Sequence, residues 1–116
     1  MFQKDMKMAL LLDFYGDILT ERKLEIMQMY YDEDCSLSEI AEEMGISRQG
    51  VRDAVKRSEC ELSSLEDKLG LASRFEKLKG EIALIAGEVS SVGEAFEGEA
   101  KDELERIKDR LLKLDI

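Results

Sequence analysis

The sequence predicts an all-α protein, and three kinds of observation support this class. The 116 residues include no Pro and 38% charged side chains, a composition typical of helical proteins. Apolar residues recur at spacings of three and four along most of the chain. Ser, Thr and Gly stand where helices would begin and end. We therefore expect five or six helices and no strand.

Two helices are predicted before residue 35. Apolar residues over 5–15 share one helical face, and Gly16 follows as a stop. Thr20 is placed to cap the second helix, and the acidic residues 32–34 form a loop after it. The side chains that we expect to be buried are Met8, Leu11, Leu12 and Tyr15 in the first helix, and Leu24, Met27 and Tyr31, helped by Ile26 and Tyr30, in the second.

A helix-turn-helix is predicted over residues 36–57. Ser36 and Glu39 have the spacing of a capping box. Gly45 stands at the left-handed position that ends a helix, and Ser47 caps the next helix. Two helices joined by three residues, with Gly first, have the geometry of this motif. The apolar residues expected to seal the two helices together are Ile40, Ala41, Ile46, Val51 and Val55.

Longer helical patterns fill the rest of the chain. The helix that begins after Ser47 is predicted to run to Leu69, before Gly70. Apolar residues over 71–96 then alternate at spacings of four and three, and a shorter series follows over 104–114. We expect a break near residues 87–91, since Gly and Ser gather there and Ser91–Glu94 has the form of another capping box. Heptad spacing favours helices that pack lengthwise against others.

The composition argues against several classes of protein. Two cysteines, Cys35 and Cys60, without any His fall short of the roughly four ligands of a structural metal site, so we expect reduced thiols and no metal or cofactor. The sequence has neither a nucleophile–base pair nor a Gly-rich phosphate loop, so we do not expect an enzyme. The apolar run 8–12 ends at Asp13, too short for a signal peptide or for the roughly 20 residues of a membrane span. We expect a cytoplasmic protein.

Charge is distributed unevenly along the chain. The net charge is −10, yet Ser47–Arg57 holds four basic and one acidic side chains, a local charge of +3. An acidic protein repels the phosphates of nucleic acids at long range. The one basic segment nevertheless coincides with the second helix of the helix-turn-helix, which is the helix that would read DNA.

The outward side of this second helix is the candidate nucleic-acid interface. We expect Gln49 to pair with adenine and Arg52 with guanine in the major groove, and Arg48, Lys56 and Arg57 to contact phosphates. A solvated helix face that binds nothing is the alternative. The residues placed off the apolar stripe, and therefore predicted to bind, are Arg48, Gln49, Gly50, Arg52, Asp53, Lys56 and Arg57.

Residues 36–57 resemble region four of bacterial sigma factors, and residues 6–75 as a whole resemble the YlxM family of bacterial helix-turn-helix proteins. The marks of the second resemblance are DFY at 13–15, LT at 19–20, YY at 30–31 and SRQGVRDAVKR at 47–57. It implies a DNA-binding protein, encoded beside the GTPases of the signal recognition particle, that modulates that pathway. The sigma pattern is basic at the end of its second helix, where this chain has Glu59, Glu61, Glu66 and Asp67.

We accordingly expect a helix-turn-helix head over residues 1–70, winged-helix-like or sigma region four-like, and a helical extension over 71–116. Two functional hypotheses remain. In the first, the chain regulates by binding duplex DNA as a homodimer, paired through residues 71–114, because Leu78, Ile82, Ile85 and Val89 form too apolar a stripe to stay exposed. In the second, the same fold contacts the GTPase or RNA of the signal recognition particle without specific DNA binding. Neither hypothesis includes membrane insertion.

Overall fold

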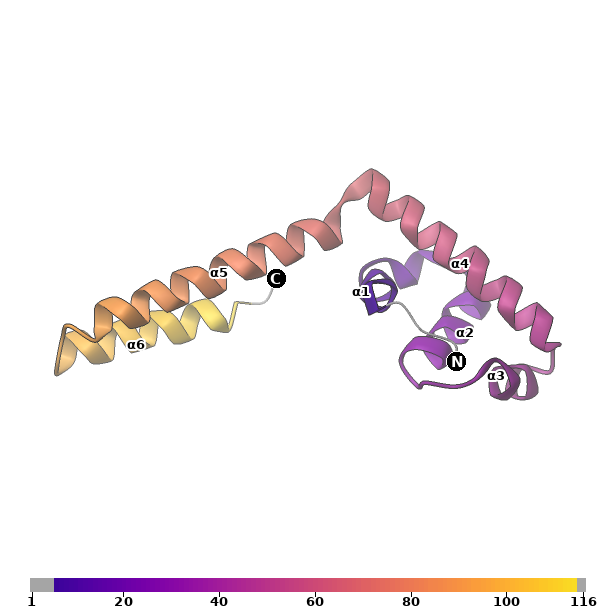
Figure 1. Ribbon diagram of the computed structural model, residues 1–116, viewed down its shortest axis with the longest axis horizontal. Helices are drawn as coiled ribbons and strands as arrows, with labels where there is room; N and C mark the ends of the chain where they lie inside the picture. Colours follow the sequence, from indigo (N-terminus) through magenta and orange to yellow (C-terminus); the bar gives the residue numbers. More distant parts are fainter. Residues whose placement is uncertain (1–5, 115–116) are drawn as a thin grey trace. The chain divides into compact units, whose positions relative to one another are not determined.

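The computed structural model describes residues 6–114, and these residues form six α-helices with no strand (Figure 1). A single 3-10 turn, η1 (Gly16–Ile18), follows the first helix. The all-α class is therefore confirmed, while the described residues provide no β-hairpin that could form the wing of a winged helix. The helices are α1 (Met6–Tyr15), α2 (Glu21–Tyr31), α3 (Leu37–Met44), α4 (Arg48–Leu69), α5 (Leu71–Gly93) and α6 (Glu99–Leu112).

The chain divides into two compact units, residues 1–72 and residues 73–116. The first unit contains α1 to α4 and the start of α5. Its central element is α4, which packs against α1, α2 and α3. One line of α4 side chains is buried in this contact, namely Val51, Val55, Ser58 and Leu62. The hydroxyl of Ser58 is satisfied inside the core because it donates to the Ala54 carbonyl at 2.8 Å.

The buried side of α2 differs from the predicted one. Ile26, Met27 and Tyr30 are buried, whereas Leu24 and Tyr31 are only half-buried. The spacing of three and four identified one stripe, but α2 contacts two helices, α3 and α4. Because both contacts bury side chains, the buried side of α2 is centred on Ile26, Met27 and Tyr30. In α1 the four predicted core residues are all buried; Asp5, the expected start of this helix, lies outside the described residues.

Local capping sets the ends of the helices as predicted. The Thr20 hydroxyl accepts from the Lys23 amide at 3.3 Å. Ser36 and Glu39 form both bonds of the capping box, at 3.1 and 3.0 Å. Gly70 ends α4 with φ of +65°, a left-handed conformation that is cheap for Gly alone among the common residues. These boundaries are therefore fixed by side-chain and backbone chemistry that is local in the sequence.

A buried polar cluster joins the end of α1 to the junction between α4 and α5. The Tyr15 hydroxyl donates to Glu66 Oε1 at 2.6 Å and accepts from the Leu71 amide at 3.0 Å. The same Glu66 oxygen accepts from the Ala72 amide at 3.0 Å. Two of the first amides of α5, which lack partners within the helix, are thus satisfied by these side chains. Desolvation and the Glu66 carboxylate raise the pKa of Tyr15, so the hydroxyl stays a donor.

The second unit is a hairpin of two antiparallel helices, α5 and α6 (Figure 1). The expected break near residues 87–91 is wrong, because α5 continues to Gly93. Ser91 does not cap a new helix; its hydroxyl donates to the Gly87 carbonyl at 3.1 Å, inside α5. The turn comes later, where the Phe96 amide donates to the Gly93 carbonyl at 3.1 Å.

Helix α6 packs back along α5 and covers part of its apolar stripe. Ala86 and Gly93 are buried, and Gly93 faces Leu104 of α6. Phe75 and Ile82 are half-buried and line a cavity together with Leu111. Within residues 6–114, no helix has the length and apolar character that a bilayer crossing requires.

The Tyr15 cluster yields a prediction about stability. Tyr15→Phe removes a donor and an acceptor together, and it leaves the Glu66 carboxylate and the Leu71 amide without this partner in a partly buried place. We expect the urea midpoint to fall with an unchanged dependence on urea concentration. Tyr31→Phe is the matched control and should lower the midpoint less, because Tyr31 is the less buried of the two. Equal midpoints for the two variants would contradict this account.

Candidate nucleic-acid interface

The helix-turn-helix is formed by α3, a three-residue turn and α4. Gly45 adopts φ of +66°, and the Ile46 amide donates to the Ala41 carbonyl at 3.1 Å. Ser47 then caps α4 through a bond from the Gly50 amide at 2.9 Å. Ile40 and Ala41 of α3 are buried in the core that α4 shares. The predicted motif is thus present, with Gly45 ending α3 and Ser47 capping the start of α4 as expected.

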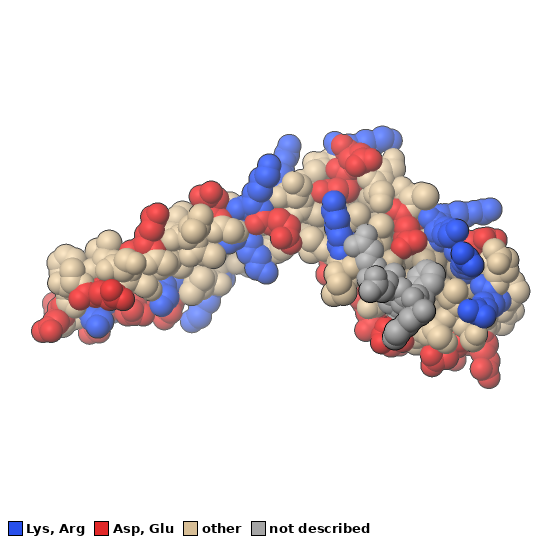
Figure 2. Space-filling model, viewed as in Figure 1, with Lys and Arg blue, Asp and Glu red and all other residues tan. Residues whose placement is uncertain are grey.

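Three cations lie along the exposed side of α4. Arg48, Arg52 and Lys56 are four residues apart and all exposed, so they form one row on the helix surface. We call these three residues the cationic row. Figure 2 shows the basic groups gathered over the N-terminal half of α4. At 1.5 Å per residue the row extends about 12 Å, close to the roughly 12 Å width of the major groove.

Gln49 and Asp53 lie beside the cationic row and bind each other. The Gln49 amide nitrogen donates to Asp53 Oδ1 at 3.0 Å, with both side chains exposed. This bond orients the amide of Gln49 and places a carboxylate next to the row. For Gln49 to make the two-bond pairing with adenine, its nitrogen must exchange Asp53 for the base.

Gly50 has a different place from the other predicted site residues. It is half-buried, and a Cβ there would lie 3.2 Å from the Ser47 hydroxyl oxygen and 3.7 Å from Ile46. Gly50 is therefore less exposed than the other predicted site residues, and its part in binding stays a prediction. Its role in the structure is to let the cap and the turn approach the first helical turn of α4.

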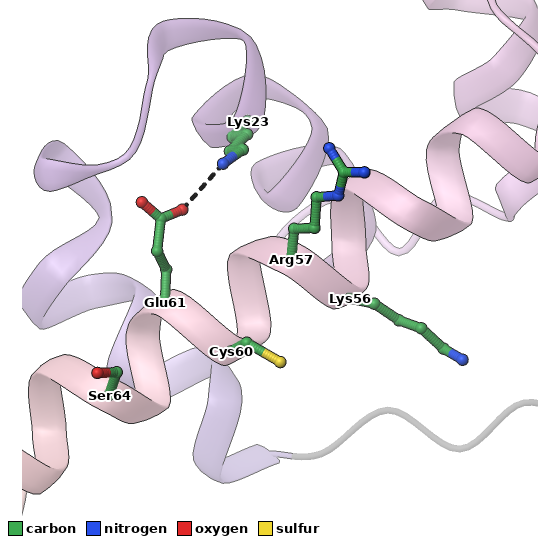
Figure 3. A pocket seen from close by; sticks show the side chains of 6 residues that line it. All are labelled: Lys23, Lys56, Arg57, Cys60, Glu61 and Ser64. Carbon is green, nitrogen blue, oxygen red and sulfur yellow. Dashed lines mark hydrogen bonds and ion pairs between the residues drawn. The ribbon is translucent and has the colours of Figure 1, made fainter.

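Arg57 leaves the row on another side of α4. It lines a shallow surface depression together with Lys56 (Figure 3), in which the two side chains extend in different directions. The far side of this depression is occupied by an ion pair between Lys23 Nζ and Glu61 Oε2, 3.0 Å apart. The residues around it are Lys23, Lys56, Arg57, Cys60, Glu61 and Ser64.

Most of the acidic residues in the second half of α4 bind groups of the same unit. Glu59 accepts from the Tyr31 hydroxyl at 2.5 Å, and Glu66 accepts from Tyr15. Glu61 pairs with Lys23 of α2. Glu59 and Glu66 are half-buried, whereas Glu61 and Asp67 are exposed. The sequence analysis treated all four only as a departure from the basic sigma pattern, although the DFY and YY marks contain both tyrosine partners.

The described residues contain no cluster of His, Cys, Asp or Glu suited to a metal ion. Cys35 is half-buried and Cys60 exposed, and neither forms a disulfide. The candidate site on α4 thus consists of the exposed cationic row and its neighbours on this helix.

Comparison with known proteins identifies the family of this chain. Residues 2–110 match UPF0122, the family of YlxM/p13-like helix-turn-helix proteins. The chain belongs to this family. A UPF0122 protein of Acetivibrio thermocellus is 42% identical over 104 residues, 89% of either chain. A second, from Desulforamulus reducens, is 42% identical over 109 residues, 93% of this chain and 90% of the relative.

A third relative shows that the similarity extends over the whole length. The UPF0122 protein of Bacillus thuringiensis is 36% identical over 115 residues, which are 99% of this chain and all of the relative. The resemblance to YlxM proteins, seen in the sequence over residues 6–75, is thus confirmed, and it also includes the α5–α6 hairpin.

The turn of the motif yields a prediction about glycine. Gly45→Ala places a Cβ at φ of +66°, where L-residues are strained, and should lower the free energy of unfolding by about 1 kcal/mol. Gly80→Ala is the matched control, because Gly80 lies inside α5 with no atom within 4 Å of the added Cβ. It should raise the free energy of unfolding by about 0.5–1 kcal/mol. Urea denaturation measures both changes in the free energy of unfolding, and changes of the same sign in the two variants would contradict the argument.

Proposed function

We propose that this protein is a regulator that binds duplex DNA through the cationic row of α4. The observation that carries the proposal is the row itself, three exposed cations on the second helix of a helix-turn-helix. Membership in a helix-turn-helix family supports it. In this class of motif the second helix enters the major groove while the first crosses the backbone.

The contacts divide by their chemistry. Arg52, at the middle of the row, is the candidate for the two-bond contact to guanine, and Gln49 for adenine. Arg48, Lys56 and Arg57 supply charge to phosphates. The first free amides of α4 next to Ser47 add a favourable helix dipole for a phosphate. Asp53 lowers the local positive charge. Because Asp53 also accepts a hydrogen bond from the Gln49 amide, Gln49 pairs only with a base that binds this amide more strongly than Asp53 does.

The net charge of −10 bears on the strength of binding. Long-range repulsion from the rest of the chain opposes association. Glu59, Glu61 and Glu66 lie farther along α4, bound to Tyr31, Lys23 and Tyr15, and their negative charge adds to this repulsion. We therefore propose weak, salt-sensitive binding, and binding rather than catalysis as the activity.

The biological setting belongs to the same proposal. The resemblance to YlxM proteins implies a modulating role in the signal recognition particle pathway, in the cytoplasm. We propose that the chain acts there as a homodimer, paired through the helices of residues 71–114. Contact with the particle's GTPase or RNA, without specific DNA binding, is the alternative. The net charge of −10 favours a protein partner with a basic surface over RNA.

Substitutions on α4 test the DNA interface. Arg52→Ala should weaken binding to one preferred sequence by about 1–3 kcal/mol more than to others, because it removes a base contact. Lys56→Ala should weaken binding to all sequences alike. For the parent, three or four phosphate contacts give a log–log salt slope of roughly −3 to −4, measured by fluorescence anisotropy with labelled duplexes. Lys56→Ala should make that slope less steep by about one.

Lys77→Ala is the control, because it removes an exposed cation of α5. It should leave the affinity and the salt slope unchanged, and circular dichroism should show the same helix content in all variants. If Arg52→Ala and Lys56→Ala bound duplexes as tightly as the parent, the cationic row would be a solvated surface. Co-purification of the particle's GTPase or RNA with those variants would then support the alternative.

A further inference from the structure

Helix α5 begins one residue after α4 ends, and that residue is a glycine. Leu69 is the last residue of α4 and Leu71 is the first of α5, so Gly70 alone joins two helices of 22 and 23 residues. Glycine adopts a wider range of backbone conformations than any other residue. A joint of one glycine therefore lets α5 leave α4 in many directions unless other groups hold it.

The start of α5 lacks the kind of cap with which α2, α3 and α4 begin. Thr20, Ser36 and Ser47 each present a side-chain oxygen that accepts from an amide in the first turn of the helix that follows. Gly70 has no side chain for this purpose. Because the first amides of a helix have no carbonyl partner within the helix, those of α5 need an acceptor from elsewhere.

Tyr15 and Glu66 supply acceptors for the first two amides of α5. The Leu71 amide donates to the Tyr15 hydroxyl, and the Ala72 amide donates to Glu66 Oε1, both at 3.0 Å. The Tyr15 hydroxyl in turn donates to the same Glu66 oxygen at 2.6 Å. We call Tyr15 and Glu66, with the amides of Leu71 and Ala72, the Tyr15 cluster. Its four residues all belong to the first unit.

The Tyr15 cluster attaches α5 to two different helices. Tyr15 is the last residue of α1, whereas Glu66 lies in the last turn of α4. Tyr15 is 1% exposed and Ala72 is 3% exposed, and both belong to the apolar core of the first unit. A bond to α4 alone would leave α5 free to swing about that bond. Attachment to two helices, together with the buried Ala72, restrains the direction of the first turn.

We propose that the Tyr15 cluster is a conformational clasp: while it is closed, α5 leaves α4 in one direction, and when it opens, Gly70 becomes a hinge. Because α5 is one continuous helix from Leu71 to Gly93, a restraint on its first turn acts on the whole helix. The inference goes beyond the proposed function and does not depend on DNA binding. It concerns how the hairpin is attached to the helix-turn-helix, whatever either of them binds.

A second pair of the same chemistry provides a matched control. The Tyr31 hydroxyl of α2 donates to Glu59 of α4, and both side chains are half-buried. This pair joins α2 to the middle of α4, away from Gly70. Its removal should weaken the first unit without freeing the start of α5.

Amide hydrogen exchange in the parent chain tests whether the cluster is closed. Glu99 and Ala100 begin α6 as Leu71 and Ala72 begin α5, and each pair follows a glycine with positive φ. In the described part of the chain, the two α6 amides have no side-chain cap. After correction for sequence, Leu71 and Ala72 should exchange at least about tenfold more slowly than Glu99 and Ala100. Equal exchange rates would overturn the inference.

Backbone amide relaxation, measured by NMR, tests the hinge. It gives a rotational correlation time for the helices of the first unit and another for the hairpin. The two times should be equal in the parent. Tyr15→Phe and Glu66→Ala each remove bonds of the cluster, and the two times should then differ. Tyr31→Phe and Glu59→Ala should keep them equal. Glu66→Gln retains an acceptor oxygen and should also keep them equal.

Each result decides for or against the clasp. Unequal times in the parent, or equal times in both Tyr15→Phe and Glu66→Ala, would show that the cluster does not restrain Gly70. Unequal times in the control variants as well would assign the effect to general loosening of the first unit. Circular dichroism should show the same helix content in every variant. If a variant loses helix content, the two measurements on the parent still decide. The anisotropy measurements on Arg52→Ala and Lys56→Ala judge DNA binding separately.

Discussion

Helix α4 is buried along one line of side chains, and the arrangement of the first unit depends on that burial. Val51, Val55 and Leu62 are at most 3% exposed, and α1, α2 and α3 all pack against this helix. Burying such side chains is worth about 1.5–3 kcal/mol each, so the rotation of α4 about its axis is strongly determined. The sides of α4 turned away from this line face solvent, and the cationic row lies on one of them, roughly 90° around the helix from the buried line.

The acidic chain presents a basic surface because its charges are separated along α4. The cationic row and Arg57 occupy the N-terminal half of this helix, and Glu59 and Glu66 lie farther along, where their carboxylates bind the tyrosines of α2 and α1. A hydrogen bond to a carboxylate is stronger than one between neutral groups, so these two acids are tied to the first unit. The proposed DNA contact therefore depends on the local charge of +3 over Ser47–Arg57 more than on the net charge of the chain.

The second unit buries much less apolar surface than the first. Its two helices bury small residues against each other, such as Ala86 and Gly93, and leave larger ones at the border. Small residues let the helices of a pair approach closely, but they bury little apolar area. Leu78, Ile85 and Val92 therefore remain at least 42% exposed, which is a large apolar surface for a single hairpin.

The sequence by itself determined most of the helices and their ends, together with the family, because these depend on local chemistry and periodicity. The capping box at Ser36 and the left-handed Gly45 and Gly70 act within a few residues, so they could be recognised without a fold. Tertiary structure alone decided which neighbour each face meets: it turned Ile26 and Tyr30 inward, brought Gly50 against the turn, and joined Glu66 to Tyr15 across 51 positions. Residues 87–91 stay helical in α5 despite the weak helix preference of Gly and Ser, and the Ser91 hydroxyl donates to the Gly87 carbonyl inside this helix and does not cap a new one.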